Sequence, residues 1–315
     1  MTAPPGAAGT AGAAHPDDDP ARGPVVVAVG GGHGLAATIR AVRRYAGHAT
    51  AVVATGDDGG STGRLRGALD LPAPGDLRRC IEAMAGEDGS PLARALGYRF
   101  EGTDVAGHAL GNLLLAGLTH ELGDFALAVE EACRLAGLDP AVGRVLPATT
   151  LPVVLRVRTS GGVVVTGQVA ITRTTGIERL TIDPADAPAP RSVVDALAAA
   201  DQVVLGPGSL YTSVLAASVV DDVREAIAKC SGHRVYVCNV RAEAGETRDY
   251  DVADHLTALR CHGIDPDVVL CQRGALAQGH LPLGAPEVVE ADVVRPHGRA
   301  HDPAKLAAAL RDLLA

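Results

Sequence analysis

The chain reads Pro24-Val-Val-Val-Ala-Val-Gly30 and continues directly with Gly31-Gly32-His33-Gly34. A short β-branched run that ends at glycine is typical of a strand buried on both faces of a parallel sheet. Residues 35–45 have the apolar spacing and the arginines of a surface helix. A second apolar run at 49–55 predicts another strand, so this part of the chain should form a right-handed βαβ unit.

The α/β rhythm continues beyond this unit, with one interruption. Residues 75–137 predict mainly helix, including 107–122 and 125–135. Short strands are expected at 145–146, 153–157 and 163–169, in an antiparallel or mixed insertion. Further strands are predicted at 202–205, 235–239 and 268–271, and further helices at 192–200, 222–229, 252–261 and 303–314. We therefore predict an α/β fold over residues 24–315, a doubly wound, mainly parallel sheet with a smaller α+β lobe inserted at 143–190.

Composition limits the class of protein. The 315 residues are 47% apolar but only 2% aromatic, so the core must consist of Ala, Val, Leu and Ile. A formal net charge of -9, without any block of Lys and Arg, argues against direct binding to nucleic acid. No apolar run approaches the roughly 20 residues that cross a bilayer, and residues 1–23 lack the apolar core of a signal peptide. We expect a cytoplasmic protein without a membrane span, preceded by a disordered tail at 1–23.

The cysteines predict neither a disulfide framework nor a zinc site. They are far apart and include no C-x-x-C pair, so buried thiols in a reducing compartment are the better interpretation. The six are Cys80, Cys133, Cys230, Cys238, Cys261 and Cys271.

The first glycine turn has the form of a phosphate-binding turn. Gly32-His33-Gly34-Leu35-Ala36-Ala37 satisfies the G-x-G-x-x-A pattern, in which glycines let the backbone approach a phosphate. The free amides at the start of the following helix attract the anion. The alternative is a tight turn without any ligand.

The loop after the second predicted strand carries Asp57 and Asp58. A carboxylate at this place can bind ribose hydroxyls, and it can also hold a Mg²⁺ ion against substrate phosphates. Arg64, a little further on, could offset phosphate charge. The alternative is a solvated acidic loop, although ordering so many neighbouring glycines is costly.

The third turn, Gly206-Pro207-Gly208-Ser209, also lies between a predicted strand and a helix, so all three loops should meet at one edge of the sheet. Ser209 could equally be a helix N-cap. His108 and Asn112 share a helical face and form either a ligand contact or a satisfied polar pair in the core. The chain has no Ser-His-Asp order, H-E-x-x-H or P-loop Lys, and with two lysines Schiff-base chemistry is improbable.

Taken together, these motifs resemble those of the YvcK-type gluconeogenesis factors, from about Val25 to the C-terminus. The motifs are Gly30-Gly31-Gly32-His33-Gly34-Leu35, Asp57-Asp58-Gly59-Gly60-Ser61-Thr62-Gly63-Arg64-Leu65-Arg66, Gly75-Asp76-Leu77-Arg78, Gly107-His108-Ala109-Leu110-Gly111-Asn112, Gly206-Pro207-Gly208-Ser209-Leu210-Tyr211-Thr212-Ser213, Tyr236-Val237-Cys238-Asn239-Val240, Gly245-Glu246-Thr247 and Arg299-Ala300-His301-Asp302.

This resemblance implies a CofD-like nucleotide-binding domain with a Rossmann-type core. It also implies a cytoplasmic protein that binds UDP-sugars such as UDP-N-acetylglucosamine and is linked to carbon metabolism, cell-wall precursor supply and cell shape. No cofactor is required and no reaction is established for the family; Mg²⁺, a homodimer and regulatory protein partners stay open. The residues expected to contact the ligand are Gly31, Gly32, His33, Gly34, Asp57, Asp58, Ser61, Arg64, His108, Asn112, Gly206, Gly208, Ser209, Tyr211, Thr212, Asn239 and Arg299.

The chain departs from the usual family pattern at three places. His33 stands where Thr is common, Arg241-Ala242-Glu243-Ala244 replaces a Met-Thr-Gln-Pro stretch, and Cys271 stands where Asn is frequent. Two other functions stay in view. The superfamily also contains the 2-phospho-L-lactate transferases, in which case Asp57 or Asp58 would hold Mg²⁺ near a transferred group. An NAD-dependent oxidoreductase is suggested only by residues 32–37.

Overall fold

The computed structural model describes residues 23–86, 89–102, 104–296 and 298–314, so the expected tail at 1–23 lies, apart from Gly23, outside the described residues. The elements in chain order are β1 (Val25–Gly30), α1 (Gly32–Val42), β2 (His48–Val53), α2 (Gly60–Leu69), α3 (Gly75–Ala85), α4 (Pro91–Ala95), α5 (Leu110–Leu122), α6 (Phe125–Leu135), β3 (Gly143–Pro147), β4 (Val154–Thr159), β5 (Val164–Thr166), α7 (Gln168–Ile171), β6 (Ile177–Asp183), α8 (Arg191–Ala198), β7 (Gln202–Leu205), the π-helix η2 (Leu210–Leu215), α9 (Ala216–Ser218), α10 (Asp221–Lys229), β8 (His233–Val237), α11 (Val252–Cys261), β9 (Val268–Gln272), β10 (Glu287–Ala291) and α12 (Pro303–Asp312).

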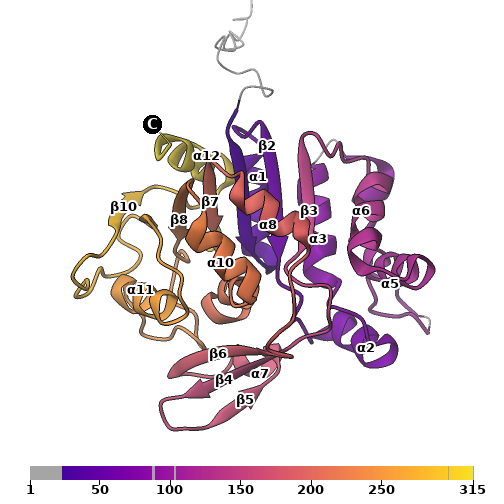
Figure 1. Ribbon diagram of the computed structural model, residues 1–315, viewed down its shortest axis with the longest axis horizontal. Helices are drawn as coiled ribbons and strands as arrows, with labels where there is room; N and C mark the ends of the chain where they lie inside the picture. The colour runs from indigo at the N-terminus through magenta and orange to yellow at the C-terminus, as the bar shows by residue number, and fades with distance from the viewer. Residues whose placement is uncertain (1–22, 87–88, 103, 297, 315) are drawn as a thin grey trace, which may run out of the picture.

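The main sheet has seven strands in the order β10-β9-β8-β7-β1-β2-β3, and every neighbouring pair is parallel. In Figure 1 it extends from β10 at the left to β3 at the right. The chain starts in the middle with β1, moves outward through β2 and β3, and returns to place β7 on the other side of β1. The predicted doubly wound α/β fold is confirmed, and its strand order reverses between β1 and β7, where such folds bind ligands.

Strand β1 separates two apolar cores because its successive side chains point to opposite faces of the sheet. Val26 and Ala28 pack with Leu35 and Ile39 of α1 on one face, together with α3 and α12. Val27 and Val29 belong to the other core, which includes α8, α10 and η2. All four β1 side chains are fully buried. The β-branched run therefore forms a central strand, as its sequence predicts.

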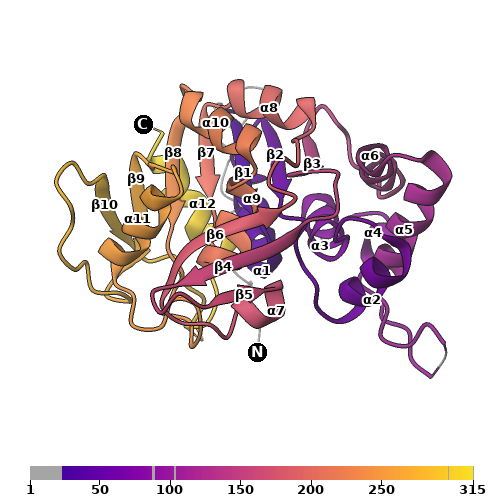
Figure 2. The ribbon, with the colours of Figure 1, turned by 60° about the horizontal axis from the view of Figure 1, so that its bottom comes forward.

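The smaller lobe is a three-stranded antiparallel sheet in the order β5-β4-β6, with α7 beside it. It lies below the carboxyl edge of the main sheet in Figure 1, and Figure 2 shows it from in front. The lobe begins later than expected: β3 pairs with β2 in parallel, so it is the edge strand of the main sheet rather than part of the insertion. Two strands, β6 and β10, were not expected at all. In β6 buried and exposed side chains are mixed, and in β10 no side chain is fully buried. Such sequences predict a strand less clearly than a continuous apolar run does.

All six cysteines are free, and five of them are buried as predicted. Cys261 is exposed at the end of α11, so the expectation of a buried thiol is wrong at that position. Within the described part of the chain, every helix is too short or too polar to cross a membrane.

Candidate functional site

The first and third glycine turns lie against each other at the point where the strand order reverses. A Cβ atom on Gly34 would clash with the carbonyl oxygen of Pro207, so the close approach of the two turns requires glycine there. The hydroxyl of Thr38, one turn further along α1, donates to the carbonyl of Gly206 over 2.6 Å. Because β1 and β7 are neighbours in the sheet, both turns emerge at its carboxyl edge. The predicted meeting of these two loops is therefore observed.

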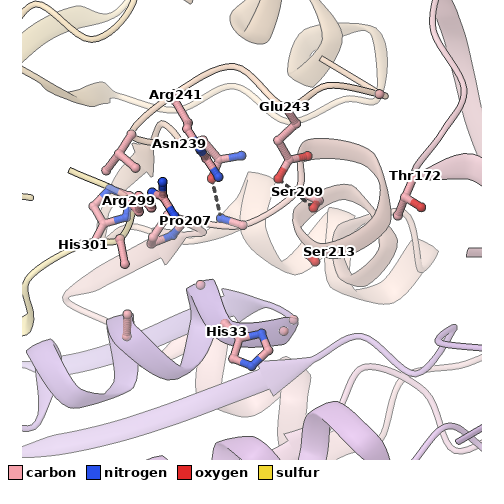
Figure 3. A pocket seen from close by; sticks show the side chains of 18 of the residues that line it. His33, Thr172, Pro207, Ser209, Ser213, Asn239, Arg241, Glu243, Arg299 and His301 are labelled. Atoms are coloured by element: carbon pink, nitrogen blue, oxygen red, sulfur yellow. Dashed lines mark hydrogen bonds between the residues drawn. The ribbon is translucent and has the colours of Figure 1, made fainter. Parts of the chain in front are cut away.

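A cavity of about 820 Å³ opens above the two turns. This volume falls within the roughly 300–1,000 Å³ of typical ligand pockets. Figure 3 shows His33 on one side and Asn239, Arg299 and His301 on the other. The lining residues are Gly31, Gly32, His33, Gly34, Ala37, Asp57, Asp76, Arg79, Gln168, Thr172, Pro207, Gly208, Ser209, Ser213, Asn239, Val240, Arg241, Ala242, Glu243, Ala244, Gly245, Arg299, Ala300 and His301.

At the start of α1, a carboxylate of the protein already occupies one amide. Asp76 accepts a hydrogen bond from the amide of Gly32 over 2.7 Å and forms an ion pair with Arg79. Across the described ranges, the next two amides of this helix, those of His33 and Gly34, have no acceptor. A helix N-terminus favours anions. The turn therefore retains the amides of His33 and Gly34 as donors for a ligand, while the amide of Gly32 is bound to Asp76.

The cavity wall around the start of α1 carries both positive and negative groups. Burial lowers the pKa of His33, and the positive charges of Arg79, Arg78 and Arg40 lower it further, so the imidazole is neutral at pH 7. Burial raises the pKa of Asp57, although the amide of Gly59, which donates to it over 2.9 Å, favours the carboxylate. The wall thus combines guanidinium groups, which attract phosphate, with carboxylates that require a counter-charge.

The opposite wall comes from the segment after β8 and the loop before α12. Asn239 accepts a hydrogen bond from the amide of Gly208 over 3.2 Å, which joins this wall to the second glycine turn. The hydroxyl of Ser209 donates to Glu243 over 2.9 Å. Burial raises the pKa of Glu243, and the hydrogen bond from Ser209 partly offsets that effect. Ser209 stands at the N-cap position of η2, as in the alternative, but its side chain binds a neighbouring carboxylate and makes no capping bond to the helix.

Tyr211 and Thr212, expected to contact the ligand, lie behind the cavity wall. Glu246 accepts from the amide of Tyr211 over 2.7 Å, the amide of Thr212 over 3.1 Å and the hydroxyl of Thr212 over 2.6 Å. Gly206 is also beneath the surface of the turn and is not among the lining residues. Glu246 thus uses the N-terminal donors of η2, and burial raises the pKa of this carboxyl to about 7.

Five other expected residues do not line the cavity. Asp58 accepts from the amide of Val169 over 2.9 Å and so fastens the small lobe to the loop after β2. Arg64 donates to the carbonyl of Ala106 over 2.8 Å. The remaining three form a buried network, in which Asn112 donates to Ser61 over 3.1 Å and Ser61 lies 3.0 Å from His108 Nδ1.

The structure corrects the expectation that Asp58 and Asn112 border the same cleft as the glycine turns. The physical reason is tertiary: Asp58 accepts from the distant amide of Val169, and Ser61 at the start of α2 accepts from Asn112 of α5. The network of Ser61, His108 and Asn112 then joins these two helices, as in the alternative of a polar pair in the core.

Several lining residues were not among the expected contacts. Asp76, Arg79, Ser213, Glu243 and His301 reach the cavity from α3, η2 and two loops. The motifs Gly75-Asp76-Leu77-Arg78 and Arg299-Ala300-His301-Asp302 contained a signal for Asp76 and His301. Nothing local indicated Arg79, because an arginine on a helix is usually a solvated surface residue.

The residues fit a magnesium ion only in company with a ligand. Of the expected pair, Asp57 faces the cavity and Asp58 does not, while Asp76 faces it as well. Within the described ranges, no cluster of three or more His, Cys, Asp or Glu side chains could hold a metal ion. Mg²⁺ commonly uses one or two carboxylates and completes its shell with phosphate oxygens and water. A bound phosphate would therefore have to supply part of the coordination.

Comparison with known proteins gives consistent matches over nearly the whole chain. A family model described as 2-phospho-L-lactate transferase CofD matches residues 26–297. The gluconeogenesis factor of Halalkalibacterium halodurans is 41% identical over 251 residues, covering 78% of this chain and 76% of that protein. A Mycobacterium tuberculosis protein, also named as a gluconeogenesis factor, is 43% identical over 307 residues, covering 90% of this chain and 89% of that protein. A crystal structure of a UPF0052 family member from Bacillus halodurans matches with a TM-score of 0.83 and 34% identity, covering 91% of this chain and 98% of that one.

Proposed function

The chain belongs to the CofD family and, within it, to the gluconeogenesis factors, and we propose that it is a nucleotide-sugar-binding regulator. The proposed ligand is a UDP-sugar, with UDP-N-acetylglucosamine as the first candidate. The regulated process would link central carbon metabolism to cell-wall precursor supply and cell shape, in the cytoplasm.

The observation that carries this proposal is the contact between the two glycine turns beneath one large cavity. Gly34 and Pro207 lie close enough to exclude a side chain, and both turns point their backbone into the same space. A diphosphate suits this place because the amides of His33 and Gly34 and the guanidinium of Arg79 are within the lining. The rest of the 820 Å³ then serves the uncharged parts of the ligand.

A second candidate function is group transfer, because the CofD family is described as 2-phospho-L-lactate transferase. Asp57 and Asp76 favour this candidate, since both carboxylates face the cavity where a ligand phosphate would lie. A Mg²⁺ ion held there would neutralise charge on the phosphates. Product analysis after incubation with nucleotide donors separates a transferase from a regulator.

The direct test is a thermal-shift screen of the wild type against UDP-sugars, guanine nucleotides and NAD(P), each with and without Mg²⁺. A ligand at 100 times its Kd should stabilise the protein by roughly 2.7 kcal/mol. We expect the largest rise in Tm with UDP-N-acetylglucosamine. A larger rise with a guanine nucleotide favours the transferase, one with NAD(P) the oxidoreductase, and either outcome would contradict the proposal.

A matched pair of glycine variants tests the observation itself. Gly34→Ala should separate the two turns and reduce UDP-sugar affinity at least about tenfold, because the new methyl group meets backbone. Gly117→Ala is the control, since Gly117 lies on the exposed side of α5 with open space around it. That change should leave affinity unaltered and raise the free energy of unfolding by roughly 0.5–1 kcal/mol. Equal affinity in both variants would exclude the turns as the binding site.

A further inference from the structure

Glu243 is held in the cavity wall by its backbone and by its side chain. Its backbone amide donates to the hydroxyl of Thr247 over 3.3 Å, and its Oε1 accepts from the hydroxyl of Ser209 over 2.9 Å. Thr247 is fully buried, and Ser209 stands at the N-cap of η2. Glu243 itself is half-buried and lines the cavity, and Figure 3 shows its carboxylate directed toward Ser209. The carboxylate is therefore oriented before any ligand binds.

The second carboxylate oxygen of Glu243, Oε2, retains its full capacity as an acceptor. Within the described residues no hydrogen bond reaches Oε2, and it is not one of the buried side-chain atoms without a partner, so it is accessible from the cavity. Two neighbouring carboxylates differ in this respect, because Asp76 and Glu246 already accept bonds through both oxygens. An ionised carboxylate only accepts, so Oε2 requires a donor from the ligand.

The charges around Glu243 favour a donor group over an anion. Burial raises the pKa of Glu243, while the hydrogen bond from Ser209 and the charge of Arg241 act in the opposite direction. Arg241 also lines the cavity, but it acts on Glu243 through its charge alone and makes no hydrogen bond to the carboxylate. A hydroxyl that donates to a carboxylate forms a charge-assisted bond, whereas a second anion at the same place is repelled.

The groups that suit phosphate lie on a different wall of the cavity. They are the amides of His33 and Gly34 and the guanidinium of Arg79. Figure 3 shows His33 on the opposite side of the cavity from Glu243. When the diphosphate is bound on the side of His33, an uncharged ring of the ligand is the part that remains for Glu243.

We propose that Glu243 determines the specificity of the cavity: Oε2 accepts a hydrogen bond from a hydroxyl of a carbohydrate ring, and the charge of Glu243 excludes ligands with a further anionic group on that ring. This inference rests on the proposed function. Specificity then comes from a repulsive element as well as an attractive one. Both the ribose and the hexose of a UDP-sugar offer such hydroxyls, so the experiment has one arm for each ring.

The experiment compares UDP-N-acetylglucosamine with two anionic analogues by isothermal titration. One analogue has a carboxylate in place of the C6 hydroxymethyl group of the hexose, and the other has a phosphate on the ribose 2′-hydroxyl. In the wild type, the analogue that is altered on the ring beside Glu243 should bind at least about tenfold more weakly than the parent. Glu243→Gln keeps the shape, can still accept from Ser209 and removes the charge, so it should reduce this penalty about tenfold. The analogue whose penalty falls identifies the ring.

Two further variants give matched controls. Glu121→Gln removes an exposed carboxylate of α5 outside the cavity and should leave the penalty unchanged, because solvent and salt screen so distant a charge. Arg241→Gln removes the positive charge that opposes Glu243 and should increase the penalty. Arg241 is exposed, so this variant should fold normally and tests the inference even where Glu243→Gln does not fold.

The outcomes separate this inference from the proposed function. If the wild type binds both analogues as tightly as the parent, the inference is overturned. A penalty that is equal in the wild type and Glu243→Gln arises from size alone and overturns it too, as does a penalty that does not rise in Arg241→Gln. In each of these cases UDP-N-acetylglucosamine still binds and the proposed function stands. If the wild type does not bind UDP-N-acetylglucosamine at all, the proposed function fails and this inference fails with it.

Discussion

At the scale of the residue, two neighbouring carboxylates have different environments. Asp57 lines the cavity, and Asp58 points away from it to accept from the amide of Val169 at the start of α7. Gly167 makes this contact possible, since a Cβ there would crowd the Asp58 carboxylate. Asp58 is therefore a residue that holds the lobe, and Asp57 is the one that can contact a ligand or its metal ion.

The pair Asp57→Asn and Asp58→Asn tests this assignment. Each change keeps the shape of the side chain and removes its charge. Asp57→Asn should weaken UDP-sugar binding about tenfold, with the larger loss when Mg²⁺ is present. Asp58→Asn should change affinity less than about threefold, because Asn can still accept from Val169. Isothermal titration with and without Mg²⁺ measures both, and a larger loss in Asp58→Asn would reverse the assignment.

At the scale of the element, α11 is held to the sheet by a buried histidine. His255 is fully buried, and its Nδ1 lies 2.9 Å from the hydroxyl of Tyr236 in β8. The ring of Tyr250 packs against it edge-on. Burial lowers the pKa of His255 to about 4, although the charge of Asp251 acts in the opposite direction. A neutral histidine in this position makes the docking of α11 sensitive to acid.

This histidine should make a measurable contribution to the pH dependence of stability. The pKa of His255 is about 4 in the folded state and about 6.5 in the unfolded chain, so between these values the unfolded state binds more protons. The contribution of neutral His255 to the free energy of unfolding is therefore fully present above pH 6.5 and is lost as the pH falls toward 4. His255→Gln should be less stable than the wild type at pH 7, and the gap should narrow by about 2 kcal/mol at pH 5.

Urea unfolding at several pH values measures that gap. The control is His120→Gln on the exposed face of α5, for which the gap should stay constant. Comparing each variant with the wild type cancels other titrating groups, including Glu246, whose raised pKa of about 7 acts in the opposite direction. A gap for His255→Gln that does not change with pH would show that the ring is not buried in its neutral form.

At the scale of the whole molecule, the cavity is assembled from segments that are far apart in the sequence. The turn after β1, the loop after β2, α7 of the small lobe, the turn after β7 and the loop before α12 all contribute. Gly245 lies so close to the carbonyl of Thr172 that a side chain there would displace the lobe. The lobe and the main sheet therefore form the site together.

Hydrogen exchange with and without UDP-N-acetylglucosamine tests this assembly. Amides in residues 31–37, 206–213 and 239–245 should exchange more slowly in the complex, because their segments surround the cavity. The amides of α6 serve as the control. This helix lines a separate hollow of about 450 Å³ beside β3, so protection confined to α6 would place the ligand there instead.

Local sequence was enough to predict most of the main sheet and both glycine turns. β-branched runs that end at glycine define β1, β2 and β7 by short-range pattern alone, and parallel strands must then meet at one edge. His33, Gly34, Asp57, Gly208, Ser209, Asn239 and Arg299 were expected at the site and line the cavity. Each directly follows a strand or belongs to a motif, so its position depends on nearby residues.

Only the tertiary structure decided which neighbour each remaining residue meets. Residues 143–147 carry no local sign that they pair with β2, and that contact moves them from the lobe to the main sheet. The sequence could not distinguish Asp57 from Asp58, because the difference is a hydrogen bond to Val169, 111 positions further along the chain. His301 likewise became a cavity residue only because folding brings the loop before α12 to the same cavity as the segment after β8. Short-range pattern specifies the backbone element, whereas the direction of a polar side chain depends on donors and acceptors that folding brings to it.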